Sequence, residues 1–206
     1  MGTATAQTIS LAPTRVPRRD VTRARICAAA REVFLLHGFD GATIEQIALA
    51  AGTRRSTLYN HFHDKNEILG AIADEYLEAV TQVVERLPGP RPSRPQIDAW
   101  IQDFASFVMR ERAPTLLVVH FGATIHAPPA TRAFGAKLMQ AFASRLPAFA
   151  AALQPGQALA QAQAVAVLRE LGWALCHHVE HEGGDLAPQM LEVAGALFER
   201  FVNDQF

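Results

Sequence analysis

The chain has few cysteines and no apolar run of membrane length. Only Cys27 and Cys176 occur among 206 residues, so a disulfide framework is not expected. The sequence does not open with a charged-then-apolar secretory leader. It also lacks a stretch of about 18 consecutive apolar residues, the minimum for a membrane-spanning helix. We therefore expect a reduced, cytoplasmic protein that makes no membrane contact.

Sequence motifs of several large enzyme classes are also missing. There is no G-x-S-x-G nucleophile elbow, no phosphate-binding G-x-x-x-x-G-K-[ST] and no zinc-binding H-E-x-x-H. No E-x-x-H pair of the kind that builds di-iron helical bundles occurs either. We expect a protein that is not an enzyme and needs no cofactor. A helical-bundle enzyme is the alternative of another class.

Apolar residues recur with helical rather than strand periodicity. Hydrophobic residues make up 50% of the chain, enough for a substantial core, and no alternating stretch is long enough to argue for a sheet. The sequence predicts an all-α protein of about nine helices, with Pro147 kinking one of them or ending it early. The expected helices cover residues 20–37, 44–51, 55–62, 65–87, 96–112, 114–126, 129–153, 157–182 and 187–204.

Three segments are expected: a flexible tail (1–19), a first domain (20–66) and a larger helical domain (67–206). The tail has no apolar periodicity, so it is either a solvated end or an arm whose Arg15, Arg18 and Arg19 touch DNA. Residues 14–65 hold nine Arg or Lys against five acidic residues, a net charge of +4, although the whole chain has −1. This imbalance assigns any polyanion binding to the first domain.

Residues 43–65, TIEQIALAAGTRRSTLYNHFHDK, carry the most specific signal. Thr43 and Gln46 have the spacing of a capping box, so a helix should begin at Ile44. Gly52 can supply the left-handed conformation that ends this helix after two turns. A second short helix follows from Arg55, and Asp64 with Glu67 predicts a second capping box. Two short helices at a tight glycine turn form a helix-turn-helix.

The same stretch and its flanks resemble the amino-terminal domain of the TetR family of regulators. The resemblance covers about Val21 to Leu69, a third of the chain. One position departs from the family: Arg54 stands where the family usually has Ser, Thr or Asp as the cap of the second helix. The matching residues are Phe34, Gly38, Phe39, Thr43, Ile47, Ala48, Ala51, Gly52, Thr57, Leu58, Tyr59, Phe62, Lys65 and Leu69.

The resemblance implies a one-component transcriptional regulator, expected to be a repressor, that binds palindromic operator DNA as a dimer. Tyr59, His61 and Lys65 match positions that usually hold phosphates. Thr43 lies at a helix start, where its hydroxyl and backbone amide can both meet a phosphate. Residues that match base-reading positions are Arg54, Arg55, Ser56, Thr57 and Asn60; Arg is suited to guanine and Asn to adenine. For the arginines a solvated charged face is the alternative, and for Tyr59 it is a ring packed on Leu58 or Phe62.

The resemblance also implies dimerisation through the last two long helices and release of DNA by a small molecule. The helices at 157–182 and 187–204 are apolar on most faces, so they need a partner surface, which an intramolecular core could also supply. Interface candidates are Ala166, Leu168, Arg169, Leu197 and Phe201. We expect a small hydrophobic effector and a signal carried by the helix that begins at Lys65.

Large side chains of the central region are the candidates for the effector site, although most aromatic residues at helical spacing belong to plain cores. Candidates are Trp100, Phe104, Phe107, His120, Phe121, Trp173 and His177, from a wider supply that includes Phe134, Phe142 and His126. The run CHHVEH at 176–181 offers an alternative, since His177 and His181 lie four apart on a helix and could bind a metal ion. A metal-responsive regulator would follow from that alternative.

Overall fold

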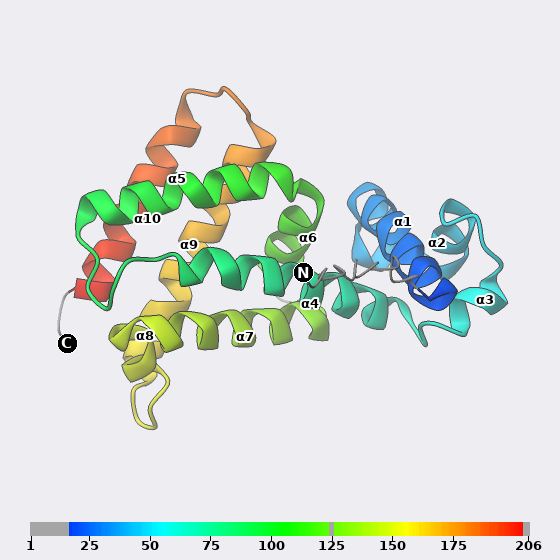
Figure 1. Cartoon of the computed structure of the whole chain (residues 1–206), viewed down its shortest axis with the longest axis horizontal. Coiled ribbons are helices and arrows are strands. Elements are labelled where there is room, and N and C mark those ends of the chain that lie inside the picture. The colour runs from blue at the N-terminus through cyan, green and yellow to red at the C-terminus, as the bar shows by residue number, and fades with distance from the viewer. Residues whose placement is uncertain (1–16, 124–125, 204–206) are drawn as a thin grey trace, which may run out of the picture.

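A computed structural model describes residues 17–123 and 126–203, and these residues form ten helices and no strand. Helices α1 to α3 form a separate lobe at one end, and α4 runs out of this lobe into a larger helical part (Figure 1). The helices are α1 (Arg18–Gly41), α2 (Ile44–Ala50), α3 (Arg55–Tyr59), α4 (Lys65–Glu85), α5 (Arg94–Arg110), α6 (Arg112–Gly122), α7 (Pro129–Arg145), α8 (Pro147–Ala152), α9 (Ala158–Glu180) and α10 (Leu186–Asn203). The prediction of an all-α fold is confirmed.

The tenth helix exists because Pro147 divides one predicted helix in two. The expected helix at 129–153 ends at Arg145, and α8 begins at Pro147. Proline has no amide proton and clashes with the preceding turn, but it fits the first turn of a new helix. The expected break at Pro147 is confirmed.

Helix α1 begins earlier than expected, at Arg18 rather than Asp20, so Arg18 and Arg19 are helical and do not belong to a tail. Near its end, Gly38 has a positive φ of 69°, which glycine adopts without strain, and the chain turns there. Residues 1–16, including Arg15 and most of the expected tail, lie outside the described residues.

The two predicted helix caps differ in completeness. Thr43 Oγ1 accepts from the Gln46 amide at 3.2 Å and Gln46 Oε1 accepts from the Thr43 amide at 2.8 Å, so this capping box is confirmed. Asp64 accepts from the Glu67 amide at 2.8 Å, as expected. However, the Glu67 carboxylate accepts from the His63 amide instead of the Asp64 amide, at 2.7 Å, so the second box is not reciprocal.

Two clusters of buried side chains share helix α4. Its first two turns place Ile68, Leu69 and Ile72 in the core of the amino-terminal lobe, and its later turns place Tyr76 and Val80 in the core of the larger part. Leu117 of α6 and Ala130 of α7 also lie in the amino-terminal core. The expected boundary after residue 66 therefore crosses a continuous hydrophobic core.

Both cysteines are free and buried. Burial raises the pKa of the Cys176 thiol to about 12, and burial also raises the pKa of Cys27. A thiol protonated at neutral pH is a poor nucleophile, so both residues behave as small apolar groups of the core.

We predict that Cys176 makes the free energy of unfolding depend on pH in the alkaline range. The pKa of Cys176 in the folded protein lies above its unfolded value of about 8.5. The contribution of Cys176 to the free energy of unfolding is therefore fully present below about pH 8.5 and is lost as pH rises toward 12. The wild type should lose about 1–2 kcal/mol more than Cys176→Ala between pH 8 and pH 10. Urea unfolding of both proteins across this range measures the difference, and parallel curves would contradict the prediction.

Candidate nucleic-acid interface and ligand cavity

The amino-terminal lobe holds two short helices at a sharp turn. Gly52, with a φ of 58°, makes the corner between α2 and α3. Leu58 and Phe62 are completely buried and fix the second helix against the core. Helix α3 is shorter than expected, since regular α-helix ends at Tyr59, although the His61 and Phe62 amides still donate to the Leu58 carbonyl.

The residues predicted to contact DNA surround this turn, and most of them are exposed. Arg54 is the N-cap of α3 but makes no side-chain cap hydrogen bond, as the departure from the family suggested. Thr57, His61 and Lys65 are partly buried, and the exposed members of the set are Thr43, Arg54, Arg55, Ser56, Tyr59 and Asn60. The turn thus gathers the predicted residues on one lobe, whereas their contacts with bases and phosphates stay predictions.

Arg55 is held by two neighbouring side chains, Glu45 and Tyr59. Its Nη1 lies 2.7 Å from Glu45 Oε1 of α2, and its Nη2 donates to the Tyr59 hydroxyl at 3.2 Å. The guanidinium carbon also lies 5.4 Å from the centre of the Tyr59 ring. Sequence reasoning missed Glu45, because the spacing of 45 and 55 gives no sign that the turn brings them together.

Lys65 joins helix α4 to the end of α1. Its Nζ donates to the backbone carbonyls of Phe39 at 2.7 Å, Asp40 at 3.1 Å and Ala42 at 3.3 Å. An ammonium group has three protons, so these three carbonyls use its full donor capacity. The geometry gives Lys65 a structural role that was not expected from sequence, and a phosphate contact would have to displace one of these bonds.

Arg23 contacts the residues that follow helix α3. Its guanidinium carbon lies 4.2 Å from the centre of the Phe62 ring, and its Nη1 donates to the His61 carbonyl at 3.2 Å. The end of the helix-turn-helix is thereby attached to α1, and His61 is positioned through its own backbone.

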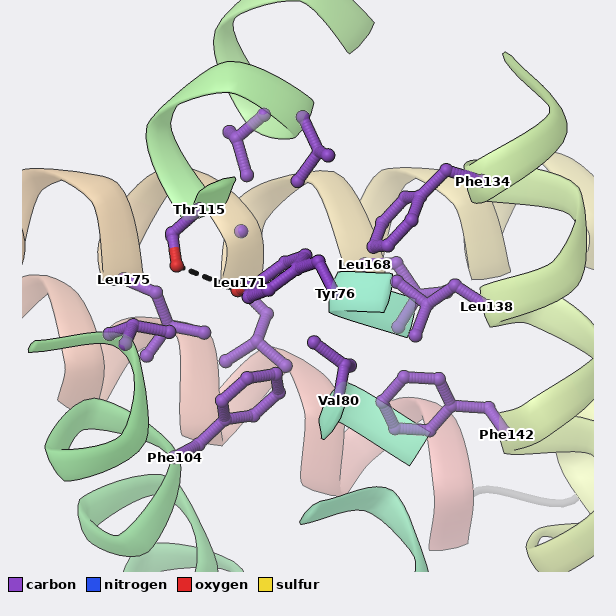
Figure 2. Close-up of a pocket in the computed structure, with 14 residues that line it drawn as sticks. Tyr76, Val80, Phe104, Thr115, Phe134, Leu138, Phe142, Leu168, Leu171 and Leu175 are labelled. Carbon is purple, nitrogen blue, oxygen red and sulfur yellow. Dashed lines mark hydrogen bonds between the residues drawn. The ribbon is translucent and has the colours of Figure 1, made fainter. Parts of the chain in front are cut away.

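The larger part encloses an apolar cavity of about 50 Å³, which we call the inner chamber. Figure 2 shows side chains from α4, α5, α6, α7 and α9 turned toward this hollow, among them Phe104, Phe134 and Phe142. One polar pair interrupts the lining: the Tyr76 and Thr115 hydroxyl oxygens are 2.7 Å apart, and Thr115 also donates to the Glu111 carbonyl. Burial raises the pKa of Tyr76, so its hydroxyl stays protonated.

A second hollow of about 300 Å³, the outer chamber, adjoins the first between α6, α7 and α9. Val118, Leu138 and Leu168 belong to the walls of both chambers. Arg132, Arg169 and Trp173 line only the outer one. Together the two chambers lead from an apolar interior to an opening that is lined by exposed arginines.

Two of the predicted effector-site residues, Phe104 and Trp173, line these chambers. Trp100 does not: it is buried among other rings, and its Nε1 donates to the Val83 carbonyl at 2.8 Å. Phe107 lies behind the lining, stacked on Tyr76 with ring centres 5.8 Å apart. The lining includes residues that the prediction did not single out, such as Tyr76, Thr115 and Arg132.

Three other predicted effector residues have different places. Phe121 packs against Phe34 and Phe39 of α1, at 6.4 and 6.0 Å between ring centres, and so connects the two parts of the chain. His120 Nε2 lies 3.5 Å from a Glu180 carboxylate oxygen. His177 stacks on His181 with ring centres 4.2 Å apart. None of the three lines either chamber.

The histidine run at the end of α9 does not form a metal-binding group with its neighbours. Cys176 points inward, with Sγ 3.9 Å from the Thr115 carbonyl oxygen. Within the described parts of the chain, no three His, Cys, Asp or Glu side chains gather in a way that could hold a metal ion. The two stacked imidazoles therefore give the metal-sensor alternative no support. In the same residues, no helix is both long and apolar enough for a membrane span.

The residues predicted for the dimer interface differ in how far they are exposed. Ala166 and Leu197 are exposed on α9 and α10. Phe201 is buried against Phe149, at 4.8 Å between ring centres, whereas Leu168 is partly buried and lines both chambers. Contacts of these residues with a partner stay predictions. Arg169 is exposed but lines the outer chamber. Helical spacing defines a face on each helix, but it does not say which face meets the rest of the chain.

Comparison with known proteins begins with the helix-turn-helix lobe. The family model described as "Bacterial regulatory proteins, tetR family" matches residues 26–72. The HTH-type transcriptional regulator SrpR of Pseudomonas putida is 49% identical over 51 residues, which are 25% of this chain and 24% of SrpR. The chain thus matches about a quarter of the length of that relative.

Solved structures match over nearly the whole chain at low sequence identity. A TetR-like transcriptional regulator from Rhodococcus sp. RHA1 is 19% identical, with a TM-score of 0.64 over 93% of this chain and 100% of its own. The regulator FadR from Bacillus subtilis, in complex with stearoyl-CoA, is 15% identical, with a TM-score of 0.60 over 89% of this chain and 99% of its own. The amino-terminal lobe is thus similar to that of TetR family regulators, and the fold of the chain is that of TetR-like regulators.

Proposed function

We propose that the chain is a dimeric one-component transcriptional repressor that binds a palindromic operator and is released from it by a small apolar ligand. The observation that carries the proposal is the exposed polar face of the α2–α3 turn, joined through α4 and α6 to a part that contains an apolar cavity. A family match over residues 26–72 supports the DNA-binding half. The cavity supports the ligand-binding half.

In the proposed complex, α3 lies in the major groove. Arg54, Arg55, Ser56, Thr57 and Asn60 read base edges, with arginine suited to guanine and asparagine to adenine. Phosphates are held by Thr43 at the start of α2, where hydroxyl and backbone amides are available, and by Tyr59 and His61. Lys65 contributes chiefly by fixing the position of the reading head, by which we mean helices α2 and α3 and the turn between them.

Dimerisation is supported by apolar side chains that the monomer leaves exposed. On α10, Leu186, Val193 and Leu197 recur at helical spacing and are 58%, 53% and 42% exposed. On α9, Leu159 is 73% exposed. Two such helix pairs can bury these stripes against each other. A dimer would present two reading heads about 34–36 Å apart, the spacing of successive major-groove half-sites.

Signal transmission runs through α6 as well as α4. Val118 of α6 lines both chambers, whereas its neighbours Leu117 and Phe121 pack in the amino-terminal lobe. A ligand that moves Val118 outward therefore moves the surface on which α1 rests. In this scheme the ligand lowers operator affinity by favouring a state whose head spacing no longer matches the palindrome.

An apolar ligand is favoured by the lining of the chambers and by one structural relative. FadR from Bacillus subtilis, which shares the fold, was solved with stearoyl-CoA. Ligand sites are mostly apolar with a few placed polar groups, and the inner chamber has that character, with the Tyr76–Thr115 pair as its polar feature.

Operator binding and its base preference can be tested together. We expect the wild type to shift a palindrome from its own upstream DNA, with affinity that falls steeply with salt. Arg55→Ala should relax preference at one base position per half-site by about 1–3 kcal/mol, because it removes the guanine contact. Gel shifts with single-base operator variants measure both effects. Absence of any specific shift, or an unchanged base preference in Arg55→Ala, would count against the proposal.

Lys65→Met should lower stability as well as operator affinity. The substitution keeps the aliphatic stem but removes the three hydrogen bonds to the end of α1. Thermal unfolding should occur at lower temperature, and affinity for all operator variants should fall alike. Lys137→Met is the control, because Lys137 forms an exposed ion pair with Asp74 far from the turn. If the stability of Lys65→Met is unchanged and the slope of log affinity against log salt concentration falls by about one, Lys65 acts through a phosphate contact alone.

The dimer can be tested at α10. Leu197→Asp places a charge in the proposed seam, so we expect a monomer with much weaker operator binding. Val193→Asp is a second variant on the same stripe, and Leu36→Asp, on a 77% exposed side chain of α1, is the matched control. Sedimentation equilibrium gives the molecular mass of each protein. A stable dimer in both seam variants would place the interface elsewhere.

A further inference from the structure

The outer chamber has an unbalanced charge. Its fifteen lining residues include Arg132 from α7 and Arg169 from α9, but no Asp or Glu. Most of the other lining residues are apolar, among them Val165, Met139 and Trp173. Two cations thus flank an apolar hollow from two different helices.

Neither guanidinium is neutralised by the protein in the described part of the chain. Arg132 donates to the Ala127 backbone carbonyl, which carries no formal charge. Arg169 forms no ion pair or hydrogen bond with any described residue. Other arginines of the larger helical part have acidic partners; Arg94, for example, forms an ion pair with Asp98. An anion that reaches both Arg132 and Arg169 could accept charge-assisted hydrogen bonds from each.

The inner chamber has the opposite character. Its polar side chains, Tyr76 and Thr115, are buried and bonded to each other, so neither is left to solvate a charge. An ionised group placed there would lose its hydration without compensation. The lining therefore becomes more polar from the inner chamber, at Phe104, to the outer chamber, at Arg132 and Arg169.

We propose that the effector is an amphipathic organic anion whose apolar chain enters the inner chamber and whose anionic head lies between Arg132 and Arg169. This proposal rests on the effector cavity of the proposed function and adds the chemical class and orientation of its occupant. The outer chamber, of about 300 Å³, reaches the lower end of the volume range of ligand pockets, and the inner chamber adds about 50 Å³ to it.

Binding of three matched probes tests the class of ligand. Decanoate carries a carboxylate, 1-decanol has the same chain without charge, and decanoyl-CoA carries its negative charges on phosphates. Isothermal titration should show decanoate or decanoyl-CoA binding about 10- to 100-fold more tightly than 1-decanol, as expected for charge-assisted hydrogen bonds. Which of decanoate and decanoyl-CoA binds more tightly shows whether the ligand is a free acid or an acyl conjugate.

Substitution of the arginines tests the position of the head. Arg132→Gln and Arg169→Gln should each weaken binding of the preferred anion about tenfold or more and leave 1-decanol binding unchanged. Arg110→Gln is the matched control, because Arg110 also donates to a backbone carbonyl, that of Ser106, but lines neither chamber. Trp173, 47% exposed in the outer chamber, should change its fluorescence when the probe binds.

Equal binding of the three probes, loss of 1-decanol binding in the arginine variants, or no binding of either anion would overturn the proposal. Failure of the proposed function gives a separate result. If the anion binds in an arginine-dependent way but leaves operator affinity unchanged, the site stands and its role as effector site fails. If the ligand-free protein shows no specific operator shift, DNA binding fails whatever the titrations show.

Discussion

Helix α4 forms a wall of both hydrophobic cores, and the behaviour of each part depends on this shared element. Ile68, Leu69 and Ile72 pack under the helix-turn-helix, and one turn later Tyr76 lies beside the inner chamber. Close-packed interiors do not deform continuously, so a change around Tyr76 has to be met by movement of the helix or of its neighbours. Helix α6 shares this arrangement, because Leu117 and Val118 face different cores. The two parts are thus coupled by packing rather than by a linker.

Local chemistry made much of the fold predictable from sequence. The Thr43–Gln46 box, the corner at Gly52 and the break at Pro147 each follow from a residue type and its spacing over a few positions. Those rules act within one turn of helix, so they hold without knowledge of the tertiary structure. The end of α1 was harder to place, since the chain continues in helical hydrogen bonding past the non-helical Gly38.

Residues whose role depends on another helix were the ones misplaced. Periodicity identified Phe121, Leu168 and Phe201 as apolar positions, but it does not say whether the facing surface is a cavity, α1 or another ring. The same limit hid Glu45 beside Arg55 and the three carbonyls around Lys65, which come from distant segments. Arg132 has no sequence signal of its own, and Arg169 was expected only at the dimer interface, because single arginines on helices are ordinary surface residues. Their meaning comes from the hollow between α7 and α9.

The Glu45–Arg55 ion pair affects how a reading head would search for its site. A guanidinium already held by a carboxylate at 2.7 Å is less available to arbitrary phosphates, so loose encounters with DNA gain little from it. Guanine offers two acceptors in the geometry that arginine matches and carries no charge, whereas a phosphate brought to Arg55 would be repelled by the Glu45 carboxylate. The carboxylate would therefore penalise wrong sequences more than the right one. An acidic residue on a DNA-binding face would in this way lower absolute affinity but raise the ratio of specific to non-specific affinity. It would also speed dissociation from incorrect sites.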